Sequence, residues 1–548
     1  MPEMVLKIRS KNTLPNKSNS IGIPSLAMKL RRLVSLCFIL FLGLTTWGST
    51  KIDRDLDLKQ EEWLPIFVRM NNQLINSAGD YEKHCDQRSH LSRTQNQEEI
   101  LKILQKKSRK SWRIIRQTIE AQEQKGAIRS LRQFWIVNGF SCLAQRSVIR
   151  MLCNHPEVSF IYLDRFTKPL RKVVPMDEVR KTRMQNVLNI WNEKKQRICT
   201  KIPWNVHEIG AVRSWNEENA TGRGVLVAVI DSGILPSPPL IHALAKNPKE
   251  ELNNRDDDGN GLIDDLFGYD FSLNTGYILD SLKTISHGSS CSGIIAGRAS
   301  QEGWQTGIAP DSKLILIKGS FNLSAMEYLL LQGADIVSMS YMIVGHELGE
   351  MRGLFRNAFE HLSLAGVVAV GGAGNYGPHS RRAMVVGKQI GLPKDIPCVL
   401  AVGGVDKKRV QVSFSSEGPC FWEGVRFYSD YPQGKPLMKP DLTAFPTGYP
   451  VWNLLGSDQI RRDWKEVSKD EGASLVIGPA GNSFSGPHAA GVIALILSIN
   501  PELNPWQVSK ILHQTAIDLG EEGQDYKFGS GLIDALSAVR AAKKVELN

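Results

Sequence analysis

Short apolar runs alternate with amphipathic stretches along the second half of the chain. The runs that are continuous and rich in β-branched residues are 225–230, 313–318, 335–340, 367–372 and 398–404. Strands that are buried on both faces have this composition. Between these runs, apolar residues recur at helical spacing in 289–298, 323–333 and 351–365. Alternating strands and helices predict an α/β fold with a mostly parallel central sheet and helices on both of its faces.

The first part of the chain has a different pattern. Residues 132–142 predict a strand, 143–155 predict a helix that ends before Pro156, and 157–165 predict a second strand. A strand–helix–strand succession of about 35 residues fits half of a ferredoxin-like α+β unit. Residues 166–203 are basic and polar, and they predict a linker.

A further helix is predicted upstream of that unit. The apolar residues that recur there at helical spacing are Leu101, Leu104, Trp112, Ile115 and Ile119. Such a stripe on a polar helix is typical of a face that packs against another element. We therefore expect an amphipathic helix that has a structural role.

A short apolar run near the N-terminus predicts a targeting segment. Lys29, Arg31 and Arg32 precede an apolar stretch from Leu33 to about Leu44, and small and polar residues follow it. This is the order of a cleavable secretory signal, and the run is shorter than the ~20 residues of a membrane span. We expect residues 1–49 to be removed, with Met28 as an alternative start. The product is then secreted or extracytoplasmic, without a stable membrane span.

Composition and charge are those of a globular protein with one basic region. The chain has 548 residues, 42% of them hydrophobic, and a formal net charge of +11. Residues 101–205 carry roughly +16, so the remainder is close to neutral. Such a block either contacts a less basic partner domain or binds an anionic surface. Because no nucleic-acid motif accompanies the charge, we favour the partner domain and expect no nucleic acid as a ligand.

The cysteines exclude some chemistry. Of eight cysteines, Cys37 lies in the targeting segment, which leaves an odd number in the processed chain. No two are spaced as CxxC, which argues against a zinc site or thioredoxin-type redox chemistry.

Three short stretches carry residues for nucleophilic catalysis. VAVIDSGI ends a predicted buried strand at Asp231, HGSSCSGIIAG opens a predicted helix at His287, and Ser485 in GNSFSGPHAAG precedes a long apolar helix. Functional groups of α/β sheets collect at the carboxyl ends of strands and at helix N-termini. A serine hydroxyl needs a neutral imidazole to take its proton, and a carboxylate to orient that imidazole. We therefore predict Ser485 as nucleophile, His287 as general base and Asp231 as the orienting group.

These stretches, together with GIAPDSKL, GADIVSMS, AGN and KPDL, resemble the subtilase family of serine peptidases. The resemblance runs from Gly224 to about Ala542. It implies a subtilisin-like three-layer fold, preceded here by an α+β ferredoxin-like prodomain. It also implies that the side-chain amide of Asn375 stabilises the oxyanion. The residues that it implies for the substrate cleft are Ser340, Tyr341, Gly371, Gly372 and Ala373.

The chain departs from the family pattern in two places. Asn482 stands where subtilases usually have threonine, and Met342 stands where they tend to have glycine beside the S1 pocket. Asparagine still donates a hydrogen bond, whereas methionine narrows or reshapes the pocket. Cys291 lies one helical turn after His287, as a free cysteine does in some subtilases, and is either a small buried hydrophobe or a redox-sensitive group.

The segment DDDGNGLIDD, residues 256–265, predicts a cation site. Asp256, Asp258, Asn260 and Asp264 place oxygen ligands at alternating positions around glycines, as calcium loops do. No glutamate stands at the twelfth position, so a structural calcium ion and a solvated acidic turn remain open. The serine chemistry itself requires no cofactor.

The combined hypothesis is an exported serine endopeptidase that hydrolyses peptide bonds through an acyl-enzyme. We expect a signal peptide in 1–49, a propeptide in 50–203 that acts as an intramolecular inhibitor, and a catalytic domain in 204–548. Its partners are protein or peptide substrates. The alternative is a catalytically impaired subtilase-fold binding or interaction protein, because of Asn482 and Met342.

Overall fold

The computed structural model describes most of the chain after the predicted signal. The described residues are 51–57, 59–165, 173–193, 197–280, 285–319, 322–343, 348–378, 380, 389–455 and 463–546. The predicted signal peptide, with Met28 and Cys37, lies outside them.

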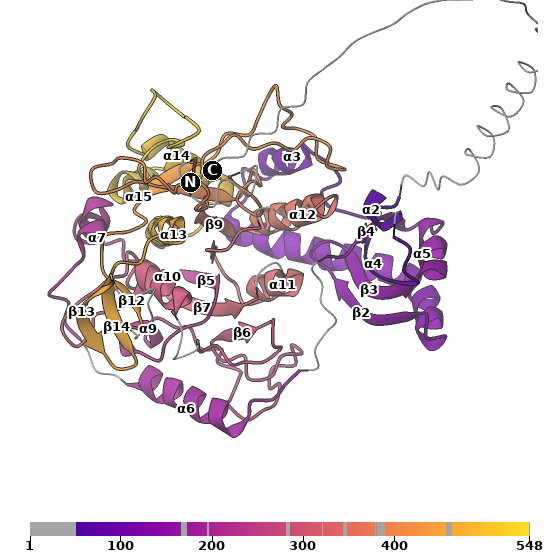
Figure 1. The fold of residues 1–548 in the computed structure, drawn as a ribbon, viewed down its shortest axis with the longest axis horizontal. Coiled ribbons are helices and arrows are strands. Elements are labelled where there is room, and N and C mark those ends of the chain that lie inside the picture. The colour runs from indigo at the N-terminus through magenta and orange to yellow at the C-terminus, as the bar shows by residue number, and fades with distance from the viewer. Residues whose placement is uncertain are drawn as a thin grey trace, which may run out of the picture. The chain divides into compact units, whose positions relative to one another are not determined.

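A seven-stranded sheet forms the centre of the larger body (Figure 1). Its strands, in spatial order, are β11 (Leu442–Ala444), β10 (Leu400–Gly404), β9 (Val368–Gly372), β8 (Ile336–Met339), β5 (Leu226–Asp231), β7 (Lys313–Lys318) and β6 (Gly268–Asp270). Every neighbouring pair is parallel. From β5 the chain builds one side of the sheet and then crosses to the other, so β5 lies at the point where the strand order reverses. Ligand sites of such sheets lie at the carboxyl ends of the strands near that point.

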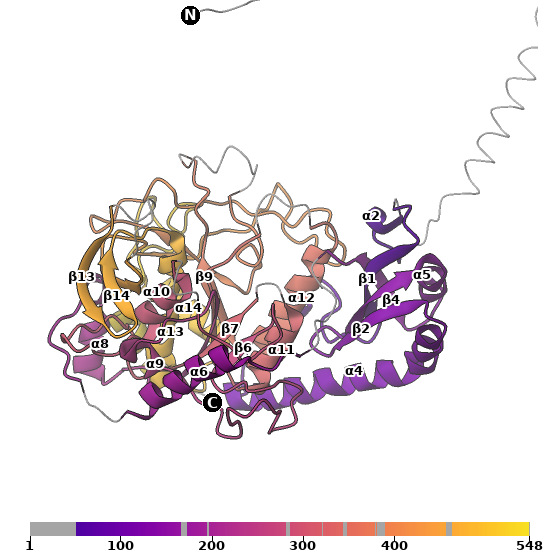
Figure 2. The ribbon, with the colours of Figure 1, turned by 60° about the horizontal axis from the view of Figure 1, so that its bottom comes forward.

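Both faces of the sheet are covered, which explains the continuous apolar runs. In β5, Val227 and Val229 belong to one hydrophobic cluster, whereas Ala228 and Ile230 belong to another on the opposite face. Strand side chains alternate between faces, so both sets must be apolar. Figure 2 shows α10 and α13 on one side of the strands and α11 and α12 on the other. The predicted three-layer α/β fold is confirmed.

Helices fill the two outer layers, and a small antiparallel sheet flanks the body. The helices from residue 178 onward are α6 (Glu178–Asn192), α7 (Trp204–Glu208), α8 (Ala211–Glu218), α9 (Pro238–Ile241), α10 (His287–Ala296), α11 (Leu323–Leu331), α12 (Met351–Leu364), α13 (Asn482–Ile499), α14 (Pro505–Thr515) and α15 (Ala535–Lys543). The small sheet consists of β12 (Val451–Asn453), β14 (Ala473–Ile477) and β13 (Lys465–Asp470). Among the described helices, α13 has the length and apolarity of a membrane span, but 83% of it is buried in this body. It is the core helix that packs on β8, β9 and β10.

The N-terminal unit is a complete ferredoxin-like fold. Its elements are α2 (Arg54–Asp57), β1 (Trp63–Met70), α3 (Asp80–Gln87), α4 (Arg93–Gln124), β2 (Ile128–Phe134), β3 (Gly139–Gln145), α5 (Arg146–Cys153) and β4 (Val158–Leu163). The antiparallel sheet has the order β2-β3-β1-β4, and α4 and α5 connect its halves. The predicted α+β character is thus confirmed.

Two predictions for this region are wrong. The single strand predicted over 132–142 is the end of β2, a turn and the start of β3, because the apolar run hides a reversal at Asn138, whose φ is 38°. The linker predicted over 166–203 contains α6, which Asp177 caps by accepting a hydrogen bond from the Arg180 N–H. Met184 and Val187 of α6 are fully buried in the cluster that also holds the sheet residue Val227. The charged residues that gather in the first half of α6 concealed this helix.

Candidate active site

Asp231 and His287 meet at the carboxyl edge of the sheet. Asp231 is the last residue of β5, and His287 is the first residue of α10. The Nδ1 of His287 lies 2.8 Å and 2.9 Å from the two carboxylate oxygens of Asp231. The backbone N–H of Ser232 donates to the same carboxylate. With Nδ1–H as donor, the lone pair of the imidazole is on Nε2, which is the state that accepts a proton.

Each of these two groups shifts the pKa of the other. Burial alone would lower the pKa of His287, but the Asp231 carboxylate outweighs it and raises that pKa well above its usual value. Burial would raise the pKa of Asp231, whereas the charge and hydrogen bond of His287 lower it. The pair therefore favours a carboxylate beside an imidazole that protonates readily.

Ser485 lies in the first turn of α13. Its neighbour Phe484 stacks on the His287 ring, with centroids 5.6 Å apart and an interplanar angle of 27°. Ser485 is fully buried, and its Oγ has no hydrogen-bond partner among the described residues. A helix N-terminus carries a partial positive charge, which stabilises a developing oxyanion. The segments that carry the three predicted catalytic residues thus converge from distant parts of the sequence.

Asn375 is held against the start of the same helix. Its Oδ1 accepts a hydrogen bond of 2.7 Å from the Asn482 backbone N–H. This contact fixes the orientation of the amide and leaves its Nδ2 to donate. A methyl group on Gly481 would lie 3.2 Å from this Nδ2, so the chain passes close to it.

The side chain of Asn482 forms hydrogen bonds that stabilise the loop carrying Asn375. Its Nδ2 donates to the Gly374 carbonyl at 2.8 Å and to Ser415 Oγ at 2.9 Å. The asparagine that replaces the family's threonine is therefore a buried donor to protein groups. In the described residues, its own Oδ1 has no hydrogen-bond partner.

The predicted cleft residues fall into two groups. Ser340 and Tyr341 are half-buried after β8, and Ser340 Oγ donates to the Ser483 carbonyl at 2.7 Å. Gly371, Gly372 and Ala373 are fully buried. A Cβ on Gly372 would lie 1.9 Å from the Asn482 carbonyl oxygen, so that glycine permits α13 to pack on β9.

Met342 occupies space beside this edge. Its Sδ accepts a hydrogen bond of 3.1 Å from the Gly391 N–H, and its Cε would lie 2.4 Å from a Cβ on Gly374. Behind it, Lys394 is fully buried and donates to the Tyr341 carbonyl. Burial lowers the pKa of Lys394 to about 7. Nothing in the spacing of the sequence indicated Lys394, because a lysine is usually a surface residue.

The thiol of Cys291 lies beneath the imidazole. Its Sγ is 3.7 Å from His287 Nδ1 and contacts Ser340 Oγ at 3.4 Å. Burial raises the pKa of this free thiol, so its protonated form is favoured. This favours a packing role over that of a reactive thiolate.

The acidic segment brings together a set of carboxylates that differs in part from the predicted one. Oxygen atoms of Asp256, Asp258 and Glu250 lie within 4.8 Å of one another. Asn260 is adjacent, and its Nδ2 lies 3.3 Å from Asp265 Oδ2. Asp264 is separate, because its Oδ1 accepts hydrogen bonds from the backbone of 253 and 254. Sequence reasoning missed Glu250, which precedes the glycine-rich loop and has no metal-binding spacing.

This cluster has the properties of a cation site. Glu250 is fully buried, and its Oε2 has no hydrogen-bond partner within the part of the chain that the structure describes. Burial raises its pKa to about 7, and the charges of Asp265 and Asp258 contribute. Burial raises the pKa of Asp265 to about 6. Carboxylate and amide oxygens are the ligands that Ca²⁺ prefers, so the residues fit that ion.

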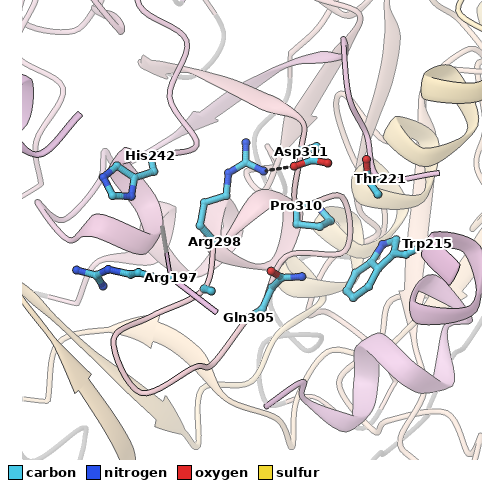
Figure 3. A pocket seen from close by; sticks show the side chains of 9 residues that line it. Arg197, Trp215, Thr221, His242, Arg298, Gln305, Pro310 and Asp311 are labelled. Carbon is cyan, nitrogen blue, oxygen red and sulfur yellow. Dashed lines mark hydrogen bonds and ion pairs between the residues drawn. The ribbon is translucent and has the colours of Figure 1, made fainter. Parts of the chain in front are cut away.

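A cavity of about 420 Å³ lies at the opposite edge of the sheet (Figure 3). Its lining includes Thr221 and Asp311, which precede β5 and β7, whereas Asp231 follows β5. The positive charges of its two arginines are balanced by ion pairs, because Arg298 pairs with Asp311 and Arg197 pairs with Asp470. The cavity is therefore separate from the predicted catalytic residues.

Comparison with known sequences points to one family. The sequence pattern of the subtilase family matches residues 222–531, which is more than half of the chain. The matched stretch contains Asp231, His287, Asn375 and Ser485.

Three relatives illustrate the similarity. Subtilisin-like protease 1 of Plasmodium berghei is 27% identical over 341 residues, which is 58% of this chain and 49% of that protein. Subtilisin DY of Bacillus licheniformis is 26% identical over 58% of this chain and 92% of its own length. The minor extracellular protease Epr of Bacillus subtilis is 26% identical over 60% of this chain and 40% of its own. The chain thus spans about half or less of the first and third relatives.

Proposed function

Because the chain belongs to the subtilase family, we propose that it is a serine endopeptidase that cleaves protein or peptide substrates through an acyl-enzyme. Ser485 Oγ attacks the scissile carbonyl while Nε2 of His287 takes its proton. The Asp231 carboxylate holds the imidazole by Nδ1–H and stabilises the imidazolium. The observation that carries the proposal is the Asp231–His287 hydrogen bond beside the helix turn that bears Ser485.

The oxyanion is stabilised by two donors in this proposal. The side-chain amide of Asn375 is free to donate, and the backbone N–H of Ser485 lies at the N-terminus of α13. His287 then returns its proton to the leaving amine, and water releases the acyl group by the same route in reverse.

Covalent labelling tests the activity against the alternative of an impaired binding protein. A fluorophosphonate probe should label the mature protein, and Ser485→Ala should abolish labelling. Ser483→Ala is the matched control, because this serine lies two residues away and contributes its carbonyl rather than its hydroxyl to the described contacts. A folded mature protein that stays unlabelled would favour the binding protein.

We also propose that the chain is an exported precursor whose N-terminal unit is the prodomain. The apolar run near Leu33 supports export, and the name of the extracellular relative agrees with it. The ferredoxin-like unit packs on α11 and α12, which supports a role as an intramolecular inhibitor and folding partner. Met184 of α6 is buried in the core of the catalytic body. This packing favours a boundary between prodomain and catalytic domain that lies ahead of Met176, in place of one at residue 203.

A structural calcium ion is proposed for the acidic loop. Glu250, Asp256 and Asp258 would hold it, with Asn260 and Asp265 close by. The unpartnered buried oxygen of Glu250 supports this proposal over that of a solvated turn. The ion would fix the segment between β5 and β6 and would take no part in the serine chemistry.

A further inference from the structure

The helix α4 has a buried side and an opposite side that is lined with cations. Ile100, Leu104, Ile115 and Ile119 are among its buried residues, and their helical spacing places them on one face. Five cations recur on the opposite face at alternating steps of four and three residues, and we call them the cationic stripe. They are Lys102, Lys106, Arg109, Arg113 and Arg116, and all of them are exposed. A helical rise of ~1.5 Å per residue makes the stripe about 21 Å long.

No acidic side chain balances the middle of the stripe. Residues 101–119 contain seven lysines and arginines and no aspartate or glutamate. The two ends of the stripe pair with glutamates of α4 itself, at 3.3 Å and 2.6 Å. Among the described residues, Lys106, Arg109 and Arg113 form no ion pair. The stripe therefore keeps most of its positive charge available.

The crowding of like charges costs the N-terminal unit free energy. Arg109 and Arg113 lie one helical turn apart, and like charges at that spacing destabilise a helix. Burial lowers the pKa of the neighbouring Lys107, and the positive charge of Lys110 lowers it further. Because the stripe brings the folded unit no benefit by itself, it points to a partner outside the chain.

The cations do not serve the contact between the two units. The first turn of α4 meets the catalytic body, where Arg93 forms an ion pair with Asp335, and Ile100 and Leu104 share a hydrophobic cluster with α12. No described residue of that body forms an ion pair with a cation of 101–119. The interpretation that this charge contacts a less basic domain does not apply to these residues. An anionic partner is the alternative that the sequence left open.

The shape of the stripe favours a linear partner. Figure 2 shows α4 as a long straight helix along the lower edge of the N-terminal unit, with no described element below that part of it in the view. The charges form a single row rather than a broad patch. A chain-like polymer with an anionic group at regular intervals can follow such a row and pair with successive cations.

Two other classes of anionic partner fit less well. Single-stranded nucleic acids stack their bases on exposed aromatic side chains, but Trp112 is half-buried and packs edge-on against Phe140 at 6.0 Å between ring centroids. Helices that bind membrane surfaces insert an apolar face between the lipids. The apolar face of α4 is already covered, because Ile115 and Ile119 belong to the core of the N-terminal unit.

We propose that the cationic stripe of α4 binds a linear anionic polysaccharide, whose sulfate, phosphate or carboxylate groups pair with successive lysines and arginines. Arginine binds such planar or tetrahedral anions through two N–H groups, and lysine binds them as a point charge. The proposed export would bring the protein into contact with polymers of this class outside the cell. The inference is independent of the proposed peptidase activity, because no predicted catalytic residue takes part in it.

Binding is measured on the full chain with Ser485→Ala, which should keep its N-terminal unit. A fluorescent heparin fragment is the probe, and its anisotropy gives the dissociation constant at about 0.15 M salt. We expect binding that weakens steeply as the salt concentration rises, because each pairing releases a counterion. Absence of binding at the starting salt concentration would overturn the proposal. Failure of the proposed peptidase would appear elsewhere, as absence of fluorophosphonate labelling in the wild type.

A triple substitution tests whether the stripe is responsible. Lys106→Gln, Arg109→Gln and Arg113→Gln together should raise the dissociation constant at least about tenfold, and should reduce the slope of its logarithm against that of the salt concentration by about two to three. Glutamine keeps the helix propensity of the residues it replaces. The Tm of this variant should equal or exceed that of its parent, because like-charge repulsion is removed.

A matched variant separates the stripe from net charge. It removes three positive charges from exposed sites of the catalytic body by the substitutions Lys408→Gln, Lys435→Gln and Lys510→Gln. These sites should change the dissociation constant less than about twofold, because salt screens charges beyond about 8 Å. Equal effects of the two triple variants would overturn the role of the stripe.

Competing ligands test the class of the partner. Vesicles of phosphatidylcholine with phosphatidylserine, and single-stranded DNA, are compared with heparin at equal concentrations of anionic groups and equal salt. Heparin should bind more tightly than either, and only its binding should depend on all three central cations of the stripe. Tighter, stripe-dependent binding of the vesicles or of the DNA would overturn the assignment to a polysaccharide.

Discussion

The protonation of His287 sets the pH range in which the proposed chemistry runs. A general base must be neutral, and Asp231 raises the pKa of His287 well above its usual value against the opposing effect of burial. The kcat/KM of the mature protein should therefore rise with pH to a plateau, with its midpoint above about pH 6.5. Profiles with a chromogenic peptide measure this midpoint.

Asp231→Asn gives the complementary result. Loss of the carboxylate should move the midpoint to lower pH and reduce kcat by about 10⁴. Asp280→Asn is the control. Asp280 is a nearby carboxylate that accepts a hydrogen bond of 2.6 Å from the hydroxyl of Ser232, the residue after Asp231. Identical midpoints in wild type and Asp231→Asn would contradict the assigned pair.

Asn375 is predicted to act in the transition state alone. Asn375→Leu should lower kcat by about 10²–10³ with little change in KM, because the oxyanion exists only during the reaction. Asn482→Thr should retain most activity, since a hydroxyl can still donate to the Gly374 carbonyl that Asn482 contacts. Steady-state kinetics of the two variants separate these roles. A KM effect without a kcat effect for Asn375→Leu would remove the oxyanion assignment.

Met342 is predicted to restrict the side chain accepted next to the scissile bond. Met342 fills the space between Gly374 and Gly391. We therefore expect a preference for small side chains at the substrate residue whose carbonyl is attacked. Met342→Gly should raise kcat/KM for a phenylalanine peptide relative to an alanine peptide by about tenfold or more. An unchanged ratio would show that Met342 lies outside the cleft.

Single residues differ in how far the sequence predicts them. Asp231, His287 and Ser485 were predicted because each lies in a distinctive stretch and the chemistry needs one of each type. Phe484 and Lys394 were missed, because their roles depend on packing against segments far away in the chain. Glu250 was missed for the same reason: it reaches the acidic loop from outside it.

At the scale of one element, the acidic loop predicts an unusual pH dependence of stability. Burial raises the pKa of Glu250 to about 7 and that of Asp265 to about 6, above the ~4 of an unfolded chain. The folded metal-free protein therefore binds more protons than the unfolded chain, so it loses stability as pH rises through about 7. The Tm of metal-free Ser485→Ala should fall between about pH 5 and about pH 7.5, and calcium should restore it most at the upper end, by about 5 °C.

Substitution within the loop tests this account. Glu250→Gln should flatten the pH dependence and weaken the response to calcium. Glu251→Gln is the control, because this neighbouring side chain is exposed. A calcium response that Glu250→Gln leaves unchanged would show that the ion binds elsewhere.

Elements with a clear pattern of apolar residues were predicted well. Elements that are short, or in which apolar and charged residues are mixed, were not. The strands β5, β7 and β10 coincide with predicted apolar runs because both of their faces are buried. The turn between β2 and β3 was overlooked, although Asn138 and Gly139 form an Asn-Gly pair, which is the usual signal of a tight hairpin turn. α6 was missed because its charged residues gather in its first half and its three buried residues all follow them.

At the scale of the whole molecule, the alternation of elements sufficed to predict the layered fold. It did not predict where the two units divide, because that depends on the burial of α6 against the body. We expect the catalytic chain of the mature protein to begin before Met176. Mass analysis of the wild type beside Ser485→Ala checks this, and the variant should remain unprocessed. A mature chain that starts near residue 204 would restore the boundary given by the sequence.

The order of Asp231, His287 and Ser485 along the chain has a consequence for biosynthesis. Asp231 and His287 emerge from the ribosome before Ser485, and α13 must then pack between strands already made and the later helix α15. A growing chain therefore lacks the proposed nucleophile until α13 has been made. A translation product that stops before α13 can retain most of the strands of the sheet, yet it cannot carry out the proposed reaction on the proteins of the cell that makes it.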